Sequence, residues 1–248
     1  MNPLSPRSCL VLHGLGGGPY ELAPVIDALR GEGFRVEAPV LPGHDDAVGP
    51  TMPGSTWPEW LGAAEAAFDG LASESEGGRV AVVGFSTGAT LALALATRRP
   101  VDRLVLLAPF LAIRFARWLV VPPRVWLGPI ARFVPDLPRR GAATLDRQVR
   151  VELAGSSRFQ TFSLSSTLSA LDLIARVVPI VGSIAAPTLI VQGVRDSVVE
   201  PSRASWLLAR LGSVEKRLVW CPRSDHLLAW DHDRIEVVAA VVRFLDHP

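Results

Sequence analysis

Short apolar runs alternate with longer amphipathic stretches along most of this 248-residue chain. The apolar runs are continuous, which is typical of parallel strands that are buried on both faces of a sheet. We predict six strands, at Cys9–His13, Val36–Val40, Val80–Gly84, Leu104–Ala108, Thr188–Gln192 and Arg217–Cys221. We predict helices between them, at Pro19–Arg30, Pro58–Ala72, Thr87–Thr97, Arg203–Leu211 and Asp233–Leu245. This order favours an α/β fold with a doubly wound, mostly parallel sheet, in a single domain over residues 1–248.

One long stretch interrupts the alternation. From about residue 110 to residue 184 there is no clear strand, only amphipathic pieces that carry several aromatic residues. Because it follows the fourth predicted strand, it is expected to lie over the carboxyl ends of the strands, where open α/β sheets bind their ligands. We interpret it as a helical cap. The arginines and tryptophans between Arg114 and Arg132 are compatible with transient contact with a lipid surface, and equally with a solvated face on a packed cap.

Composition excludes several classes of partner and location. The chain has 25 basic and 24 acidic side chains, and this balance predicts no nucleic-acid partner. The two cysteines, Cys9 and Cys221, each lie in a predicted buried strand, which does not indicate a disulfide and favours the cytoplasm. The first apolar run, Cys9–Leu12, is too short for a signal-peptide core, so we expect no signal peptide. The most apolar stretch, 104–134, is broken by arginines and prolines, so we expect no transmembrane helix there.

A candidate nucleophile lies at a predicted strand-to-helix turn. The motif Gly84-Phe85-Ser86-Thr87-Gly88 follows one predicted strand and opens the next predicted helix. A serine at such a turn is held in a strained backbone conformation that lifts its hydroxyl above the sheet, and the flanking glycines let strand and helix approach closely. This context, more than the motif alone, makes Ser86 the predicted nucleophile.

An activated serine needs a base within hydrogen-bond reach. His226 is the best candidate, because it lies in a loop directly after the last predicted strand, at the edge of the sheet where the nucleophile is expected. The other four histidines are less well placed. His13 ends the first predicted strand and His44 lies in an early loop. His232 lies in a charged turn, and His247 lies near the C-terminus.

The base in turn needs a carboxylate that fixes its tautomer. At turns of this kind the three residues follow in chain order serine, acid, histidine, so the acid is sought between Ser86 and His226. Asp196 fits best, since it closely follows the strand Thr188–Gln192, and Glu200 is the nearby alternative. We interpret Asp225 and Asp231, which flank the histidine in sequence, as solvated residues of a loop and a helix start.

Acyl transfer also needs donors for the oxyanion of the tetrahedral intermediate. We predict the backbone N–H of Thr87, at a helix N-terminus, and that of Leu15, in the glycine-rich turn 13–18. That turn could instead belong to a dinucleotide-binding motif, but the required third glycine is replaced by Pro19 or by Glu21 in the two possible registers. No metal-binding or nucleotide-binding pattern occurs in the sequence, so we expect neither a metal nor another cofactor.

Taken together, these motifs resemble those of the α/β-hydrolase family of bacterial carboxylesterases and monoacylglycerol lipases. The resemblance covers most of the chain and includes the motifs at 10–17, 39–44, 56–60, 84–88, 187–196 and 224–226. Thr87 departs from the leucine or methionine that is usual after the nucleophile. The resemblance implies a cofactor-independent serine hydrolase of short-to-medium acyl esters or monoacylglycerols, with a small cap over an apolar acyl pocket.

Two alternatives to ester hydrolysis stay open. The same three residues could act on a thioester, an amide or a carbon–carbon bond, because the leaving-group side of the site is formed by the insertion. The chain could also be a non-catalytic module that binds a small ligand, since fold alone does not establish activity. The complete set of serine, acid and histidine favours an enzyme.

Overall fold

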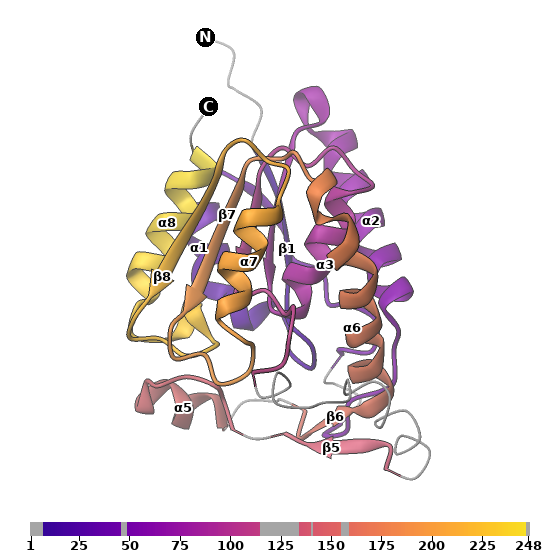
Figure 1. Ribbon diagram of the computed structural model, residues 1–248, viewed down its shortest axis with the longest axis vertical. Helices are drawn as coiled ribbons and strands as arrows, with labels where there is room; N and C mark the ends of the chain where they lie inside the picture. Colours follow the sequence, from indigo (N-terminus) through magenta and orange to yellow (C-terminus); the bar gives the residue numbers. More distant parts are fainter. Residues whose placement is uncertain (1–6, 46–48, 115–133, 140, 155–158, 247–248) are drawn as a thin grey trace.

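Six parallel strands form the central sheet, in the order β2-β1-β3-β4-β7-β8. The computed structural model describes residues 7–45, 49–114, 134–139, 141–154 and 159–246. The strands are β1 (Ser8–Leu12), β2 (Arg35–Glu37), β3 (Val80–Phe85), β4 (Leu104–Leu107), β7 (Thr188–Gly193) and β8 (Lys216–Cys221). Every neighbouring pair is parallel, so all six carboxyl ends lie at one edge, the lower one in Figure 1.

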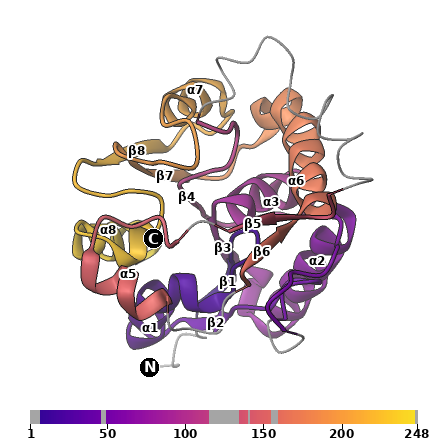
Figure 2. The ribbon, with the colours of Figure 1, turned by 90° about the horizontal axis from the view of Figure 1, so that it is seen from below.

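Helices cover both faces of this sheet (Figure 2). On one face lie α1 (Ala23–Gly31) and α8 (Arg234–Asp246), which contact each other. On the other lie α2 (Trp57–Glu74), α3 (Thr87–Ala96), α6 (Leu164–Val177) and α7 (Ser202–Arg210). The strands β1, β3, β4 and β7 are buried along their whole length, as their continuous apolar runs predicted.

The edge strand β2 is shorter than predicted. It ends at Glu37, whereas the apolar run continues to Val40, whose side chain is 53% exposed. The strand pairs only with β1, and its last paired residue is Glu37, opposite Leu10. The apolar run therefore overestimated the length of a strand that has only one neighbour.

The insertion between β4 and β7 contains two short strands, so the prediction that it has none was wrong. β5 (Asp136–Pro138) and β6 (Thr161–Ser163) pair antiparallel in a separate two-stranded sheet. Each has three residues, which is too few for a period-2 pattern to be recognised in sequence. Together with α5 (Arg147–Ala154), they lie beyond the carboxyl ends of the main strands (Figure 1). The segment 114–132, considered above for lipid contact, lies almost entirely outside the described residues.

The last part of the insertion, α6, flanks the sheet. Its buried side chains Leu164, Ala170, Leu173 and Val177 lie on the face that packs against α2 and α3. Among the described residues, the run Leu164–Ser183 is the one helical run long and apolar enough to cross a membrane by length and composition, and 33% of it is buried in the protein. A core helix of a globular domain can meet the same criterion, and the buried side chains of α6 pack against α2 and α3.

Candidate active site

Ser86 lies at the tight turn between β3 and α3, as predicted. Its φ of 54° and ψ of −119° are a conformation that non-glycine residues rarely adopt, so the backbone is strained at this residue. The turn is possible because glycines flank it. A Cβ on Gly84 would lie 2.4 Å from the carbonyl oxygen of Gly88, and one on Gly88 would lie 2.3 Å from that of Leu12. Only glycine fits where β1, β3 and α3 approach so closely.

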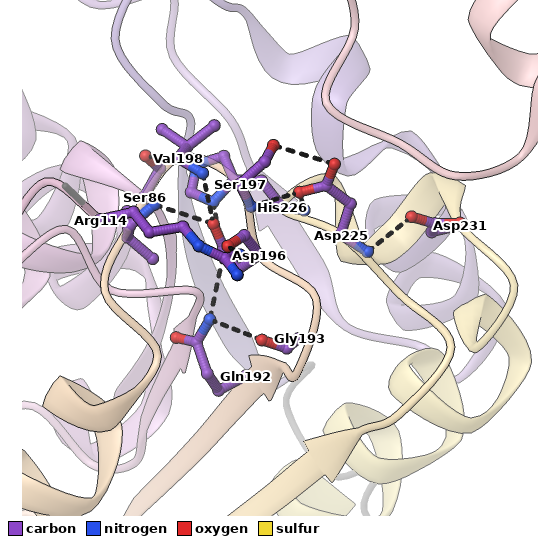
Figure 3. Close-up of polar contacts among 11 residues, drawn as sticks. Ser86, Arg114, Gln192, Gly193, Asp196, Ser197, Val198, Asp225, His226 and Asp231 are labelled. Atoms are coloured by element: carbon purple, nitrogen blue, oxygen red, sulfur yellow. Dashed lines mark hydrogen bonds and ion pairs between the residues drawn. The ribbon is translucent and has the colours of Figure 1, made fainter.

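The structure brings Ser86, His226 and Asp196 together. The Nε2 atom of His226 lies 2.9 Å from the Oγ atom of Ser86, and its Nδ1 atom lies 2.8 Å from Oδ2 of Asp196 (Figure 3). The residues follow β3, β8 and β7 respectively, so the common edge of the parallel sheet gathers them. They are 8%, 6% and 0% exposed, which keeps the contacts away from bulk water.

Asp196 is held as an ionised carboxylate by several donors. Oδ1 accepts the backbone N–H groups of Val198 and Val199, at 2.9 and 2.8 Å. Oδ2, which contacts His226, also accepts the side-chain amide of Gln192 at 2.9 Å. Burial alone would raise the pKa of Asp196, but the His226 imidazole and the backbone donors outweigh it and lower the pKa below its usual value. The ionised carboxylate of Asp196 accepts the Nδ1–H of His226.

That hydrogen bond decides which nitrogen of His226 faces the serine. With Nδ1 protonated and bonded to Asp196, the lone pair of Nε2 faces the hydroxyl of Ser86. Burial alone would lower the pKa of His226, but the carboxylates of Asp196, Glu21 and Asp225 outweigh it and raise the pKa. The imidazole is therefore a stronger base than it would be in the same pocket without these charges.

The turn that carries Leu15, one predicted oxyanion donor, lies against the nucleophile. A Cβ on Gly14 would lie 3.2 Å from the Cβ of Ser86, so the two turns are in close contact. The turn is closed by a hydrogen bond from the N–H of Gly17 to the carbonyl of Gly14, at 3.2 Å. The buried Glu21 accepts the N–H of Gly14 at 3.2 Å. Thr87, the other predicted donor, is the first residue of α3 and adjoins Ser86.

Two other predicted alternatives have different surroundings. Glu200, the rival acid, follows in the same loop as Asp196, and its Oε1 accepts the hydroxyl of Ser202 at 2.9 Å. His13 is buried at the start of the glycine-rich turn 13–18, where its Nε2 accepts the N–H of Leu41 at 3.0 Å. Burial and the nearby His44 lower the pKa of His13 to about 3, so this imidazole is neutral and structural.

Asp225 and Asp231 are not solvated, so this part of the sequence interpretation was wrong. They are 7% and 0% exposed, and both accept backbone N–H groups. Short acidic side chains in loops readily bond to nearby backbone, which makes their burial possible. Their burial could not be predicted from sequence, because some of the donors, Ser197 for Asp225 and Leu145 for Asp231, come from segments far away in the chain. Gln192 was also missed, since it lies inside a predicted apolar strand.

No group of three or more histidine, cysteine, aspartate or glutamate side chains that could hold a metal ion occurs in the described ranges of the chain. Cys9 and Cys221 are both buried and free, and burial raises the pKa of each thiol to about 12. The candidate site is therefore made of the serine, the imidazole, the carboxylates and the backbone amides described above.

Comparison with known proteins gives matches over nearly the whole chain. The sequence profile of the family described as serine aminopeptidase, S33, matches residues 5–233. A thermostable monoacylglycerol lipase of Bacillus sp. (strain H-257) is 25% identical over 239 residues, which cover 96% of this chain and 90% of the relative. A carboxylesterase of Bacillus subtilis (strain 168) is 24% identical over 241 residues, covering 97% and 92%.

Solved structures agree with these sequence matches. The monoacylglycerol lipase of Paleococcus ferrophilus superposes with a TM-score of 0.81 and 21% identity, over 97% of this chain and 95% of that one. A monoglyceride lipase of Saccharomyces cerevisiae, solved with a substrate analogue, gives a TM-score of 0.82 and 17% identity, over 99% and 87%. These matches confirm the predicted α/β-hydrolase fold and the resemblance to bacterial carboxylesterases and monoacylglycerol lipases.

Proposed function

The chain belongs to the hydrolase family described as serine aminopeptidase, S33, and from this membership we propose that it hydrolyses carboxylic esters through an acyl-enzyme on Ser86. The observation that carries the proposal is the continuous chain of contacts from Ser86 through His226 to Asp196. A serine that is strained at a strand-to-helix turn, bonded to a base that is bonded to an acid, has the arrangement required for nucleophilic catalysis.

The proposed reaction has two halves. In the first, the Oγ of Ser86 attacks the ester carbonyl carbon while His226 takes its proton, and the imidazolium then gives that proton to the departing alcohol. In the second, His226 takes a proton from water as the water oxygen attacks the acyl-enzyme, and returns it to Ser86 as the acid leaves. Asp196 stays ionised throughout and stabilises the imidazolium, and the amides of Leu15 and Thr87 stabilise the oxyanion.

The proposed substrates are short-to-medium acyl esters or monoacylglycerols. The two Bacillus relatives, a monoacylglycerol lipase and a carboxylesterase, support this class. The position of β5, β6 and α5 beyond the carboxyl ends of the strands supports a cap over the acyl chain, within the insertion at about 110–184. A thioester or amide would use the same residues, so both belong in the substrate panel.

The test is turnover of p-nitrophenyl esters from acetate to palmitate, monoacylglycerols, an acyl thioester and an aminoacyl p-nitroanilide. The Ser86→Ala variant should lose turnover. The control variant Ser202→Ala, at an exposed serine, should keep it. Alanine is a fair replacement at this position, because its Cβ meets the same backbone strain as that of serine. Mass spectrometry after treatment with a phosphonate should show one label, on Ser86.

Each outcome of this experiment decides between the alternatives. Serine-dependent turnover of esters above the other substrates supports the proposal, and a thioester or anilide preference replaces the ester in it. Turnover that persists in Ser86→Ala contradicts the assigned nucleophile. If the wild type turns over none of these substrates and Ser86 stays unlabelled, ester hydrolysis is refuted, and a ligand bound under the cap becomes the next thing to look for.

A further inference from the structure

A second buried carboxylate, that of Asp225, joins the loop of the base to the loop of the acid (Figure 3). Its Oδ1 accepts two backbone N–H groups, from Ser197 and from His226, both at 2.7 Å. Its Oδ2 accepts the hydroxyl of Ser197 at 3.0 Å. Ser197 is the residue directly after Asp196, so one side chain ties the backbone of the base to the backbone next to the acid.

The same loop is held from its other side by Asp231. The N–H of Asp225 donates to Oδ2 of Asp231 at 2.8 Å. Asp231 also accepts the N–H groups of Leu145 and Asp146, at 2.9 and 3.2 Å, from the segment that leads into α5. The base is therefore fixed between the acid loop and the insertion by two successive buried carboxylates.

The partners of Asp225 leave its charge available to act on its neighbours. Burying a carboxylate is unfavourable unless hydrogen bonds replace its water, and Asp225 has three such bonds. In the part of the chain that the structure describes, these donors are two amides and a hydroxyl, so none of them carries a formal positive charge. The negative charge lies next to the backbone of a residue that becomes cationic during the proposed reaction.

We propose that Asp225 is a positioning residue for catalysis, which fixes His226 against Asp196 and stabilises its protonated form. This inference rests on the proposed function, because it assigns Asp225 a role toward the base of that reaction. Among the described residues, the carboxylates whose charge acts on His226 are those of Asp196, Glu21 and Asp225, and the guanidinium of Arg114 bonds the carbonyl oxygen of Asp196. Asp225 is among the groups that raise the pKa of the imidazole.

Two substitutions at residue 225 separate the geometric effect from the charge. Asp225→Asn keeps an oxygen that can accept both N–H groups, and its NH₂ can donate to the hydroxyl of Ser197, so the loop stays in place without the charge. Asp225→Ala removes both the hydrogen bonds and the charge. The matched control is Asp233→Asn, which changes a buried carboxylate that bonds Arg223 and Ser224. Asp233 is not among the charges that raise the pKa of His226.

In Asp225→Ala, kcat should fall about 10²-fold with little change in KM, the effect of displacing a catalytic group by about 1 Å. In Asp225→Asn, most of kcat should remain at the optimum pH. The acidic limb of its kcat/KM profile should move to lower pH, because an imidazolium that loses a nearby negative charge gives up its proton more readily. Asp233→Asn should leave that limb unmoved.

An NMR titration of the His226 imidazole should show the same shift, and this measurement needs no turnover. If the wild-type protein hydrolyses no ester, the proposed function is refuted. The NMR titration still measures the effect of Asp225 on His226 in that case. The inference is overturned if Asp225→Asn leaves both the limb and the titration in place, or if Asp225→Ala lowers kcat no more than Asp233→Asn does. Thermal unfolding of each variant distinguishes a misplaced base from an unfolded chain.

Discussion

β4 and β5 are consecutive strands in the chain, yet they are stabilised in different ways. β4 is a continuous apolar run, fully buried and paired on both sides, with β3 and β7. β5 is Asp136-Leu137-Pro138, only partly buried and paired on one side, with β6. The first strand is determined by its own residues, because burial on two faces demands an apolar run. The second depends on a partner more than 20 residues away, so its own sequence says little about it.

Substitutions at the edge of the main sheet and in the insertion should differ most in their effect on turnover. Asp196→Asn should lower kcat by about 10⁴-fold, because an amide can no longer hold His226 in the tautomer that faces Ser86. The control is Glu200→Gln, in the same loop, which should retain most of the activity. In the insertion, Val151→Ser should also retain it, since that side chain is 70% exposed. Steady-state kinetics on one ester would measure all three, and equal losses at 196 and 200 would contradict the assignment of the acid.

The next contrast lies within the insertion. Leu173→Ala in α6 should destabilise the protein by about 2–5 kcal/mol, because it removes a fully buried side chain between α6 and the helices α2 and α3. Val151→Ala in α5 should change the free energy of unfolding by less than about 0.5 kcal/mol. Urea unfolding measures both. Similar changes in the free energy of unfolding for the two variants would mean that α6 packs against the sheet and its helices no more tightly than α5 does.

A smaller contrast is expected between glycines of the two regions. Gly84→Ala should cost about 1–3 kcal/mol or more, because its Cβ would meet the backbone of α3 at 2.4–2.7 Å. Gly141→Ala has open space around its Cβ and should be neutral or slightly stabilising. Chemical unfolding of the two variants compares them directly, and a harmless substitution at residue 84 would contradict the close approach of β3 and α3.

The smallest effect is expected in the pH dependence. His226 must be neutral to accept a proton, and its pKa is raised, so kcat/KM should decline as the pH falls through a value above the ordinary 6.5. Glu21→Gln removes one of the carboxylates that raise this pKa, so the decline should move to lower pH. Asp146→Asn, at the start of α5, should leave it unmoved. A profile that shifts equally in both variants would indicate a change in net charge alone.

The residues whose position follows from the topology of the sheet could be predicted from the sequence. Ser86, Asp196 and His226 each follow a strand of a parallel sheet, and the carboxyl ends of such strands meet at one edge. The fold and the grouping of these three residues could therefore be predicted without knowing any single contact.

The parts that were missed depend on contacts across long sequence separations. Asp231 bonds the backbone of Leu145, 86 residues away, and Asp225 bonds Ser197, 28 residues away. The sequence of a loop does not show whether the carboxylate of an aspartate is hydrogen-bonded to water or to a distant backbone amide. β5 and β6 escaped recognition for the same reason, since each is defined by its partner.

The order of the strands along the chain also determines when the site can form during synthesis. The proposed base, His226, follows Ser86 by 140 residues and comes after β8, the last strand in the described part of the chain. At a synthesis rate of about 5–20 residues per second, Ser86 waits about 7–28 seconds for its partner to be translated. Until β8 has docked beside β7, the proposed base is not in place beside Ser86. We therefore expect a reactive serine to appear only after β8 has joined the sheet.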